Sequence, residues 1–154
     1  MAEGRKDVYG AKFTTPIGRF SYPHVFEKAK GMDGQEGKYE LTLLIPKEDV
    51  EGFKRVKDSL ESVAKEAFGP RFRGLENLKN NPIKDGDEIA EDAKLQGKDR
   101  ESFRGHWVIR PRSGKPVAVV NADKTAATKD DIYGGCYGRA NVTPASYSAA
   151  GNWG

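Results

Sequence analysis

The sequence predicts a mainly β protein, built as a small antiparallel barrel or curled sheet with one inserted helix. Three observations lead to this fold class. Six short segments have strand-like composition or alternation, one segment has a strong helical period, and Pro and Gly residues separate the segments. The chain has 154 residues, which is the size of one domain, so we expect a single domain over residues 1–154.

Residues 7–14 and 19–26 are predicted to form the first two strands, separated by a turn at residues 15–18. Pro23 makes the second strand an edge strand or ends its first half. A glycine-rich loop over residues 31–37, which we expect to be mobile, leads to the third strand at residues 38–45. In that strand one face carries Tyr39, Leu41, Leu43 and Ile45, and the other carries Glu40 and Thr42.

The only strong helical pattern begins at Pro46. Apolar residues recur at spacings of three and four as far as Ala67, acidic residues stand in the first turns, and Gly69-Pro70 ends the pattern. Residues 70–100 are charged and weakly patterned, and they contain several turn signals. We therefore predict one helix after the third strand, followed by a long charged loop.

Three further strands are predicted at residues 103–110, 116–120 and 135–143. In the first of these, one face carries Phe103, Trp107 and Ile109, which favours a core position for Trp107, and the other carries Arg104, His106, Val108 and Arg110. In the last strand, a small apolar face of Cys136, Gly138, Ala140 and Val142 stands opposite Tyr137, Arg139, Asn141 and Thr143.

Six short strands with one helix after the third are the ground plan of an OB-fold, a five- to six-stranded antiparallel barrel. A two-layer α+β sandwich would give much the same pattern and is the alternative architecture.

The composition narrows the class of protein. The net charge of +3 permits nucleic-acid binding without requiring it, but residues 102–129 hold six basic residues against Asp123 alone. Cys136 is the only cysteine, which excludes an intramolecular disulfide and fits a reducing compartment. The N-terminus lacks the apolar run of a secretory signal, and no segment approaches the roughly 20 apolar residues of a membrane span. We expect a soluble cytoplasmic protein without a membrane partner.

Three segments, residues 12–24, 103–115 and 131–142, combine basic and aromatic residues. Basic side chains bind the phosphates of single-stranded nucleic acid, and aromatic rings stack on its bases. Alternation puts Phe20, Tyr22 and His24 on one face, but the sequence does not divide core rings from exposed ones. Each segment alone could be an ordinary solvated strand or hairpin, and their coincidence favours binding. The candidate residues are Lys12, Arg19, Phe20, Tyr22, Trp107, Arg110, Arg112, Lys115, Tyr137 and Arg139.

Catalytic and metal sites are poorly supported. The two histidines, His24 and His106, lie far from each other and from Cys136, and the chain has neither a Gly-x-Ser-x-Gly elbow nor a Walker-type phosphate loop. One cysteine and two scattered histidines do not make a zinc site. We expect no catalytic residue, metal or cofactor. The acidic residues of segment 84–92 are interpreted as a solvated loop that could shield a basic groove, with a magnesium nuclease site as the alternative.

Four segments resemble a family of bacteriophage single-stranded DNA-binding proteins, the Enc34-type family, formerly a domain of unknown function. They are residues 16–23, 38–47, 82–87 and 131–139. The last, with its pattern Asp131-x-Tyr133-x-Gly135-Cys136-Tyr137, is the specific one, and the resemblance spans roughly residues 8 to 150. It implies an OB-fold, binding rather than catalysis, and a role in viral DNA replication or recombination inside the infected bacterium. It also implies that Tyr137 and Arg139 belong to the binding surface, with Tyr133 nearby.

Relatives that resemble this chain continue further and end in an acidic tail, which recruits replication proteins and competes with DNA. This sequence stops at Trp153-Gly154 without an acidic run, so we expect contacts with phage or host replication proteins through such a tail to be missing here. Single-stranded DNA is the expected partner, and duplex DNA is a further candidate ligand. A structural or protein-binding phage component that does not bind DNA is the other alternative.

Overall fold

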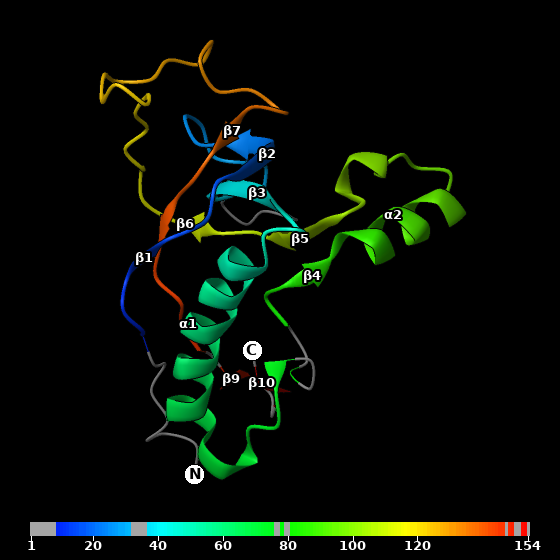
Figure 1. Cartoon of the computed structure of the whole chain (residues 1–154). Coiled ribbons are helices and arrows are strands. Elements are labelled where there is room, and N and C mark those ends of the chain that lie inside the picture. Colours follow the sequence, from blue (N-terminus) through cyan, green and yellow to red (C-terminus); the bar gives the residue numbers. More distant parts are fainter. Residues whose placement is uncertain are drawn as a thin grey trace.

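The structure is a computed structural model in which residues 9–31, 37–75, 78, 81–146, 148–149 and 152–153 are described. Most of the predicted 31–37 loop and the first two residues of the predicted strand 7–14 lie outside these ranges. The main feature is a six-stranded sheet in the order β4–β5–β3–β2–β7, with β6 also pairing to β3 (Figure 1). Its strands are β2 (Gly18–His24), β3 (Tyr39–Pro46), β4 (Lys84–Asp85), β5 (His106–Ile109), β6 (Arg112–Ser113) and β7 (Tyr137–Gly138).

Two smaller two-stranded sheets complete the described β structure. They join β1 (Phe13–Thr14) to β8 (Asn141–Val142) and β9 (Ser148–Ala149) to β10 (Asn152–Trp153). All of the described strand pairs are antiparallel, which confirms the mainly β, antiparallel class. The outer strands β4 and β7 of the main sheet do not pair with each other in the described residues, so barrel closure is not observed.

Strand β3 is the centre of the main sheet. β2 pairs along one edge, while β5 and β6 pair along the other in a single register, from Pro46↔His106 to Tyr39↔Ser113. Arg110 and Pro111 therefore only interrupt one long partner of β3, which continues as β6. Five consecutive residues of β3, from Leu41 to Ile45, are buried, so both faces of the sheet are covered here.

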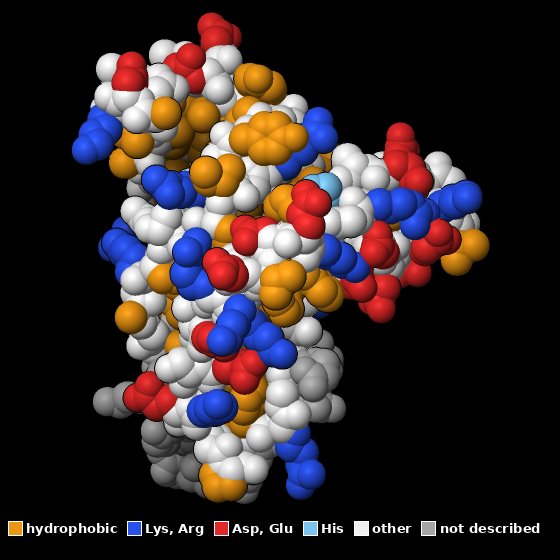
Figure 2. Space-filling view, viewed as in Figure 1, with side chains coloured by type: hydrophobic (Ala, Val, Ile, Leu, Met, Phe, Trp, Pro, Cys, Tyr) orange, Lys and Arg blue, Asp and Glu red, His pale blue; other side chains and the backbone are white. Residues whose placement is uncertain are grey.

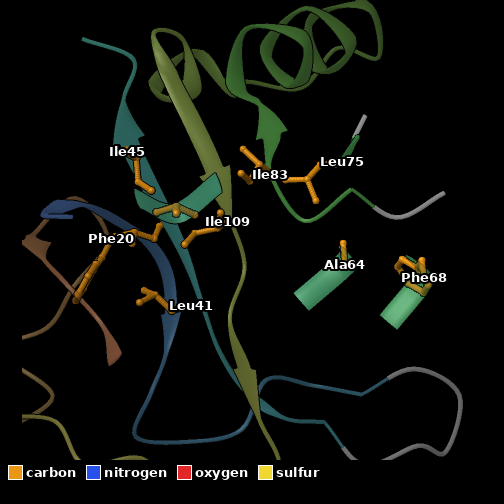
Figure 3. Packing of buried hydrophobic residues seen from close by; sticks show 10 residues of the cluster. Phe20, Leu41, Ile45, Ala64, Phe68, Leu75, Ile83 and Ile109 are labelled. Atoms are coloured by element: carbon orange, nitrogen blue, oxygen red, sulfur yellow. The ribbon is translucent and has the colours of Figure 1, made fainter. Parts of the chain in front are cut away.

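Helix α1 (Val50–Phe68) covers one face, as its helical period predicted. Its buried residues Val56, Ala64 and Phe68 belong to the same cluster as Leu41, Leu43 and Ile45 of β3. Figure 3 shows Phe20, Leu41, Ile45 and Ile109 converging from β2, β3 and β5. Asp49 caps the helix by accepting a hydrogen bond from Gly52 N at 2.9 Å, and the helix ends at Gly69, whose φ is 59°.

A second helix contradicts the prediction of one helix and a long loop. Helix α2 (Gly86–Leu95) lies in the charged segment and projects from the sheet beside β4 (Figure 1). Asp85 caps it by accepting from Asp87 N at 2.9 Å. The buried residues of α2 are the small Gly86, Ala90 and Ala93, which give little apolar signal in the sequence. The prediction of a solvated loop at residues 84–92 is thus wrong, because the segment forms β4 and most of α2.

The other sheet face is covered near α2 by Leu44, Val108 and Phe103, with Ile89 of α2 packed against them. The prediction that Phe103 shares a face with Trp107 and Ile109 is wrong, because Phe103 packs on the opposite side of the sheet from these two residues. A 3₁₀ turn, η4 (Glu101–Phe103), and Gly105, whose φ is 77°, break the extended chain before β5 begins.

The predicted strand 116–120 is not formed. Val117 and Val120 are exposed, and only an isolated bridge joins Val120 to Ala126. The segment belongs to a long arch between β6 and β7 (Figure 1). The predicted strand 135–143 is divided into β7, which pairs with β2, and β8, which pairs with β1. In the described part of the chain, no helix combines the length and apolar character needed to cross a membrane.

Candidate nucleic-acid interface

Among the described residues, no helix lies on the sheet face opposite α1 over β2, β6 and β7, and we call this region the open face. Arg19 of β2 pairs with Leu44 on one side and with Tyr137 of β7 on the other, so these three residues share a face. Leu44 packs toward α2 and not toward α1, which fixes the side. Arg19 and Tyr137 are therefore neighbours on the open face, and the Tyr137 side chain is 72% exposed.

The predicted alternation along the Gly135–Thr143 segment is confirmed. Tyr137, Arg139, Asn141 and Thr143 are exposed, whereas the intervening Cys136, Gly138, Ala140 and Val142 are partly buried. Two backbone hydrogen bonds hold the start of the segment to β2, from Phe20 N to Cys136 O and from Gly135 N to Phe20 O, each 2.7 Å long. The side chain of Arg19 donates from Nε to Gly135 O at 3.3 Å, which holds the guanidinium beside β7.

Phe20 lies on the opposite side of the sheet from Arg19. It is only 9% exposed and belongs to the α1-side core. Gly138 makes room for its ring, because a Cβ at Gly138 would come within 2.6 Å of Phe20 Cζ. The structure thus places Phe20 under the open face rather than on it.

Trp107 does not lie on the open face either. It is partly buried on the α1 side, where its ring stacks on Phe53 with centroids 4.7 Å apart and planes at 26°. Lys47 Nζ lies 4.6 Å from the centroid of the same ring. The core position that the alternation favoured for Trp107 agrees with this packing.

Tyr22 reaches the surface because of a β-bulge. The register of β2 against β3 shifts between Ser21 and His24, so Tyr22 and Pro23 together oppose one residue. Tyr22 has a φ of 48°, and its side chain is 51% exposed. The prediction that Phe20, Tyr22 and His24 share a face is therefore wrong, because the bulge interrupts the alternation between them. The guanidinium carbon of Arg100 lies 5.1 Å from the Tyr22 ring centroid.

The remaining predicted cations are exposed. The register of β3 with β5 and β6 puts Arg110 and Arg112 on the open face, and Arg112 Nε lies 3.5 Å from Glu40 Oε2. Lys12, Lys115 and Arg139 are exposed outside the six-stranded sheet, and Tyr133 is exposed in the arch. The structure thus brings Arg19, Tyr22, Arg110, Arg112 and Tyr137 together on or beside the open face. Arg100 was not predicted as a candidate binding residue from the sequence, because it lies in the segment predicted to be a charged loop.

Several acidic residues of the charged segment pair with basic side chains. Lys47 Nζ donates to Asp85 Oδ1 and to Asp87 Oδ2, both at 2.7 Å, and Asp87 Oδ1 also accepts from Gly105 N. These bonds raise the pKa of Lys47 and lower the pKa of Asp87. Arg104 bridges Glu91 and Glu101. No group of residues with metal-ligand geometry occurs among the described residues.

The first residue of the specific motif organises the arch. Asp131 Oδ2 accepts from Thr128 N at 2.9 Å, from Thr128 Oγ1 at 3.2 Å and from Asn121 Nδ2 at 3.3 Å. The bond from Thr128 N is the main cause of a lowered pKa at Asp131. Asp131 therefore fixes the path of the chain that leads to Tyr133 and β7.

Figure 2 shows basic, acidic and apolar side chains over the main body of the molecule, and closely intermixed acidic and basic side chains on the projecting α2 region. A surface of cations and flat rings can bind a polyanion whose bases also expose flat faces. The open face has this chemistry, whereas the charges around α2 largely neutralise one another.

Comparison with known proteins gives a consistent result. Residues 11–154 match the family described as Enterobacter phage Enc34, ssDNA-binding protein. No curated protein matches the chain significantly.

Three solved structures of the single-stranded DNA-binding protein from bacteriophage Enc34 are similar over 92% of this chain. A C-terminally truncated form has 28% identity and a TM-score of 0.67, with 78% of that chain covered. A complex with single-stranded DNA has 27% identity and a TM-score of 0.65, also with 78% covered. A third structure has 25% identity and a TM-score of 0.63, with 73% covered.

Proposed function

This chain belongs to the family of the Enterobacter phage Enc34 single-stranded DNA-binding protein, and we propose that it binds single-stranded DNA across the open face without catalysing a reaction on it. The observation that carries this proposal is the Arg19–Tyr137 pair. A guanidinium held by Gly135 lies beside a ring that is 72% exposed, on a part of the sheet face that no helix of the described residues covers.

The two members of this pair have different tasks. Tyr137 stacks on a base, which contributes about 1–3 kcal/mol irrespective of the base, because every base has a flat face. Arg19 binds a phosphate next to that base. Binding of this kind is sequence-tolerant and weakens with salt, with a log–log slope of about −0.7 for each phosphate neutralised.

The rest of the interface extends from this pair. Tyr22, Arg110 and Arg112 continue the path over β2 and towards β6, while Lys12, Lys115, Tyr133 and Arg139 bind the strand where it enters or leaves the sheet. Phe20 and Trp107 support the sheet from the α1 side rather than touching a base.

We further propose that the sheet is a variant of the OB-fold and that residues 1–154 form a single domain. The protein acts in phage DNA replication or recombination, within the infected bacterial cell. Phage or host replication proteins are its proposed further partners.

A titration of a fluorescently labelled oligo-dT strand tests the proposal. We expect Tyr137→Ala to weaken binding by about 5- to 150-fold, the equivalent of one lost base stack. Tyr9→Ala is the matched control, because Tyr9 is 71% exposed but lies beside Ala145, away from the open face. Equal affinity of the two folded variants would remove Tyr137 from the site.

Two further experiments distinguish the proposed function from the alternative functions. Incubation of a labelled single strand with the protein and Mg²⁺ leaves the strand intact if the protein only binds it, and shortens it if the protein is a nuclease. A protein-binding phage component would show no salt-dependent binding of either single-stranded or duplex DNA.

A further inference from the structure

We propose that Arg100 is a positioning residue of the interface: it stacks on the inner face of the Tyr22 ring and so presents the outer face of that ring to a base. This inference rests on the proposed function and adds a second base-stacking point to it. The observations that carry it are the 5.1 Å contact between Arg100 Cζ and the Tyr22 ring centroid and the bulge that brings Tyr22 to the surface.

The backbone at Tyr22 shows why the ring needs support. A φ of 48° lies in the left-handed region, which an aromatic residue rarely adopts. The bulge between Ser21 and His24 imposes it, and regular pairing would have directed Tyr22 toward the core face together with Phe20. An exposed ring in a disfavoured backbone conformation beside a candidate binding surface suggests a functional reason for its direction.

Arg100 comes from a different part of the chain, and its backbone is well anchored. It ends the linker between α2 and η4, its carbonyl accepts from Phe103 N at 3.0 Å, and Phe103 is buried beside Leu44 and Val108. The Arg100 side chain also donates from Nη1 to the carbonyl of Asp99 at 2.8 Å. This linker therefore carries the guanidinium to β2 from the α2 side of the sheet.

The chemistry fits an arginine better than another cation. A planar guanidinium stacks flat on a tyrosine ring and still carries a positive charge, whereas an ammonium is a more strongly hydrated point charge. Because Tyr22 remains 51% exposed, the contact with Arg100 leaves much of the ring accessible. A base on that accessible surface would complete a stack of guanidinium, tyrosine and base.

A double-mutant cycle with oligo-dT, at two salt concentrations, tests this assignment. We expect Arg100→Ala to weaken binding about two- to fivefold, the size of an exposed cation–π contact, with an unchanged salt slope. In a Tyr22→Ala background the same change should have no effect, because the ring that Arg100 positions is gone. Arg100→Lys should restore part of the loss.

Lys98→Ala is the matched control. It removes the same charge from the same linker, and Lys98 is exposed without a side-chain partner among the described residues. We expect its affinity to equal that of the wild type. Thermal melting of every variant confirms that it is folded.

Two outcomes would overturn the inference while the proposed function stands. One is wild-type affinity in Arg100→Ala. The other is an equal loss in both backgrounds with a salt slope smaller by about 0.7, which would make Arg100 an independent phosphate contact. A wild-type protein that fails to bind the strand would instead refute the proposed function, and this inference with it.

Discussion

Replacing Gly138 with alanine tests how the open face is built. Gly138 lies next to Tyr137 in β7 and pairs with Gly18 of β2. A Cβ at Gly138 would lie 2.6 Å from Phe20 Cζ and 3.1 Å from both Cε atoms of that ring. The φ of Gly138 is not in the left-handed region, so alanine could adopt its backbone conformation, and the clash with Phe20 is the main cost.

The size of the effect follows from these distances. Carbon atoms in contact are normally about 3.5–4.0 Å apart, so the Phe20 ring or β7 must move by about 1 Å. Phe20 is buried within the α1-side core, and forced movement in a packed core costs about 1–3 kcal/mol. The movement also displaces Tyr137, so we expect weaker binding of single-stranded DNA.

Gly134→Ala is the matched control within the same motif. No atom lies within 4 Å of a Cβ at Gly134, and its φ is also outside the left-handed region. This variant should be neutral or up to about 1 kcal/mol more stable than the wild type, because alanine restricts the unfolded chain.

Urea unfolding followed by tryptophan fluorescence measures both variants. A free energy of unfolding for Gly138→Ala within about 0.5 kcal/mol of that for Gly134→Ala would refute the packing argument. If the argument holds, Phe20→Leu should cost less in the Gly138→Ala background than in the wild type, because the smaller side chain relieves the clash.

Two further substitutions test local features. Tyr22→Gly should be more stable than Tyr22→Ala by about 1–2 kcal/mol in urea unfolding, because Tyr22 has a φ of 48°; the usual order, with alanine more stable, would contradict the bulge geometry. Thr15 is fully buried and its Oγ1 accepts from Ala140 N at 2.9 Å, so Thr15→Val should cost about 1–3 kcal/mol by leaving that donor unpaired. Thr15→Ser, which keeps the hydroxyl, should cost less by the same measurement, and equal losses would show that packing rather than the hydrogen bond matters there.

The parts of the fold that the sequence predicted well are those with a regular repeat. Helix α1 repeats its apolar residues with a helical period, and the Cys136–Thr143 segment alternates residue by residue, so periodicity alone gave the helix and the exposed positions of Tyr137 and Arg139. Alternation failed where the backbone departs from regular geometry. The bulge at Tyr22 and the 3₁₀ turn before β5 each reversed the direction of a side chain, and neither has a clear signature in the sequence.

Other features depend on contacts between distant residues. Helix α2 buries glycine and alanine against η4 and β5, so its amphipathic pattern is weak and its Asp85 cap looked like a turn. Phe20 can pack in the core beneath the open face because Gly138 leaves room for its ring. This role of Gly138 is visible only once β7 is paired with β2. The contact between Arg100 and Tyr22 joins two segments that are far apart in the chain.

The pairing of β3 along both edges also links folding to ligand binding. β2 precedes β3 closely in the chain, whereas the β5–β6 partner follows only after both helices. Closing that long segment carries an entropic cost that is recovered only when the distant pairing forms, so the second edge of β3 should be completed late in folding. A partly folded chain with β2 and β3 alone would lack Arg110, Arg112 and Arg100 at the open face. A single strand of DNA would therefore bind the completely paired sheet in preference to such intermediates. By mass action, a higher concentration of the DNA strand would then increase the stability of the folded protein.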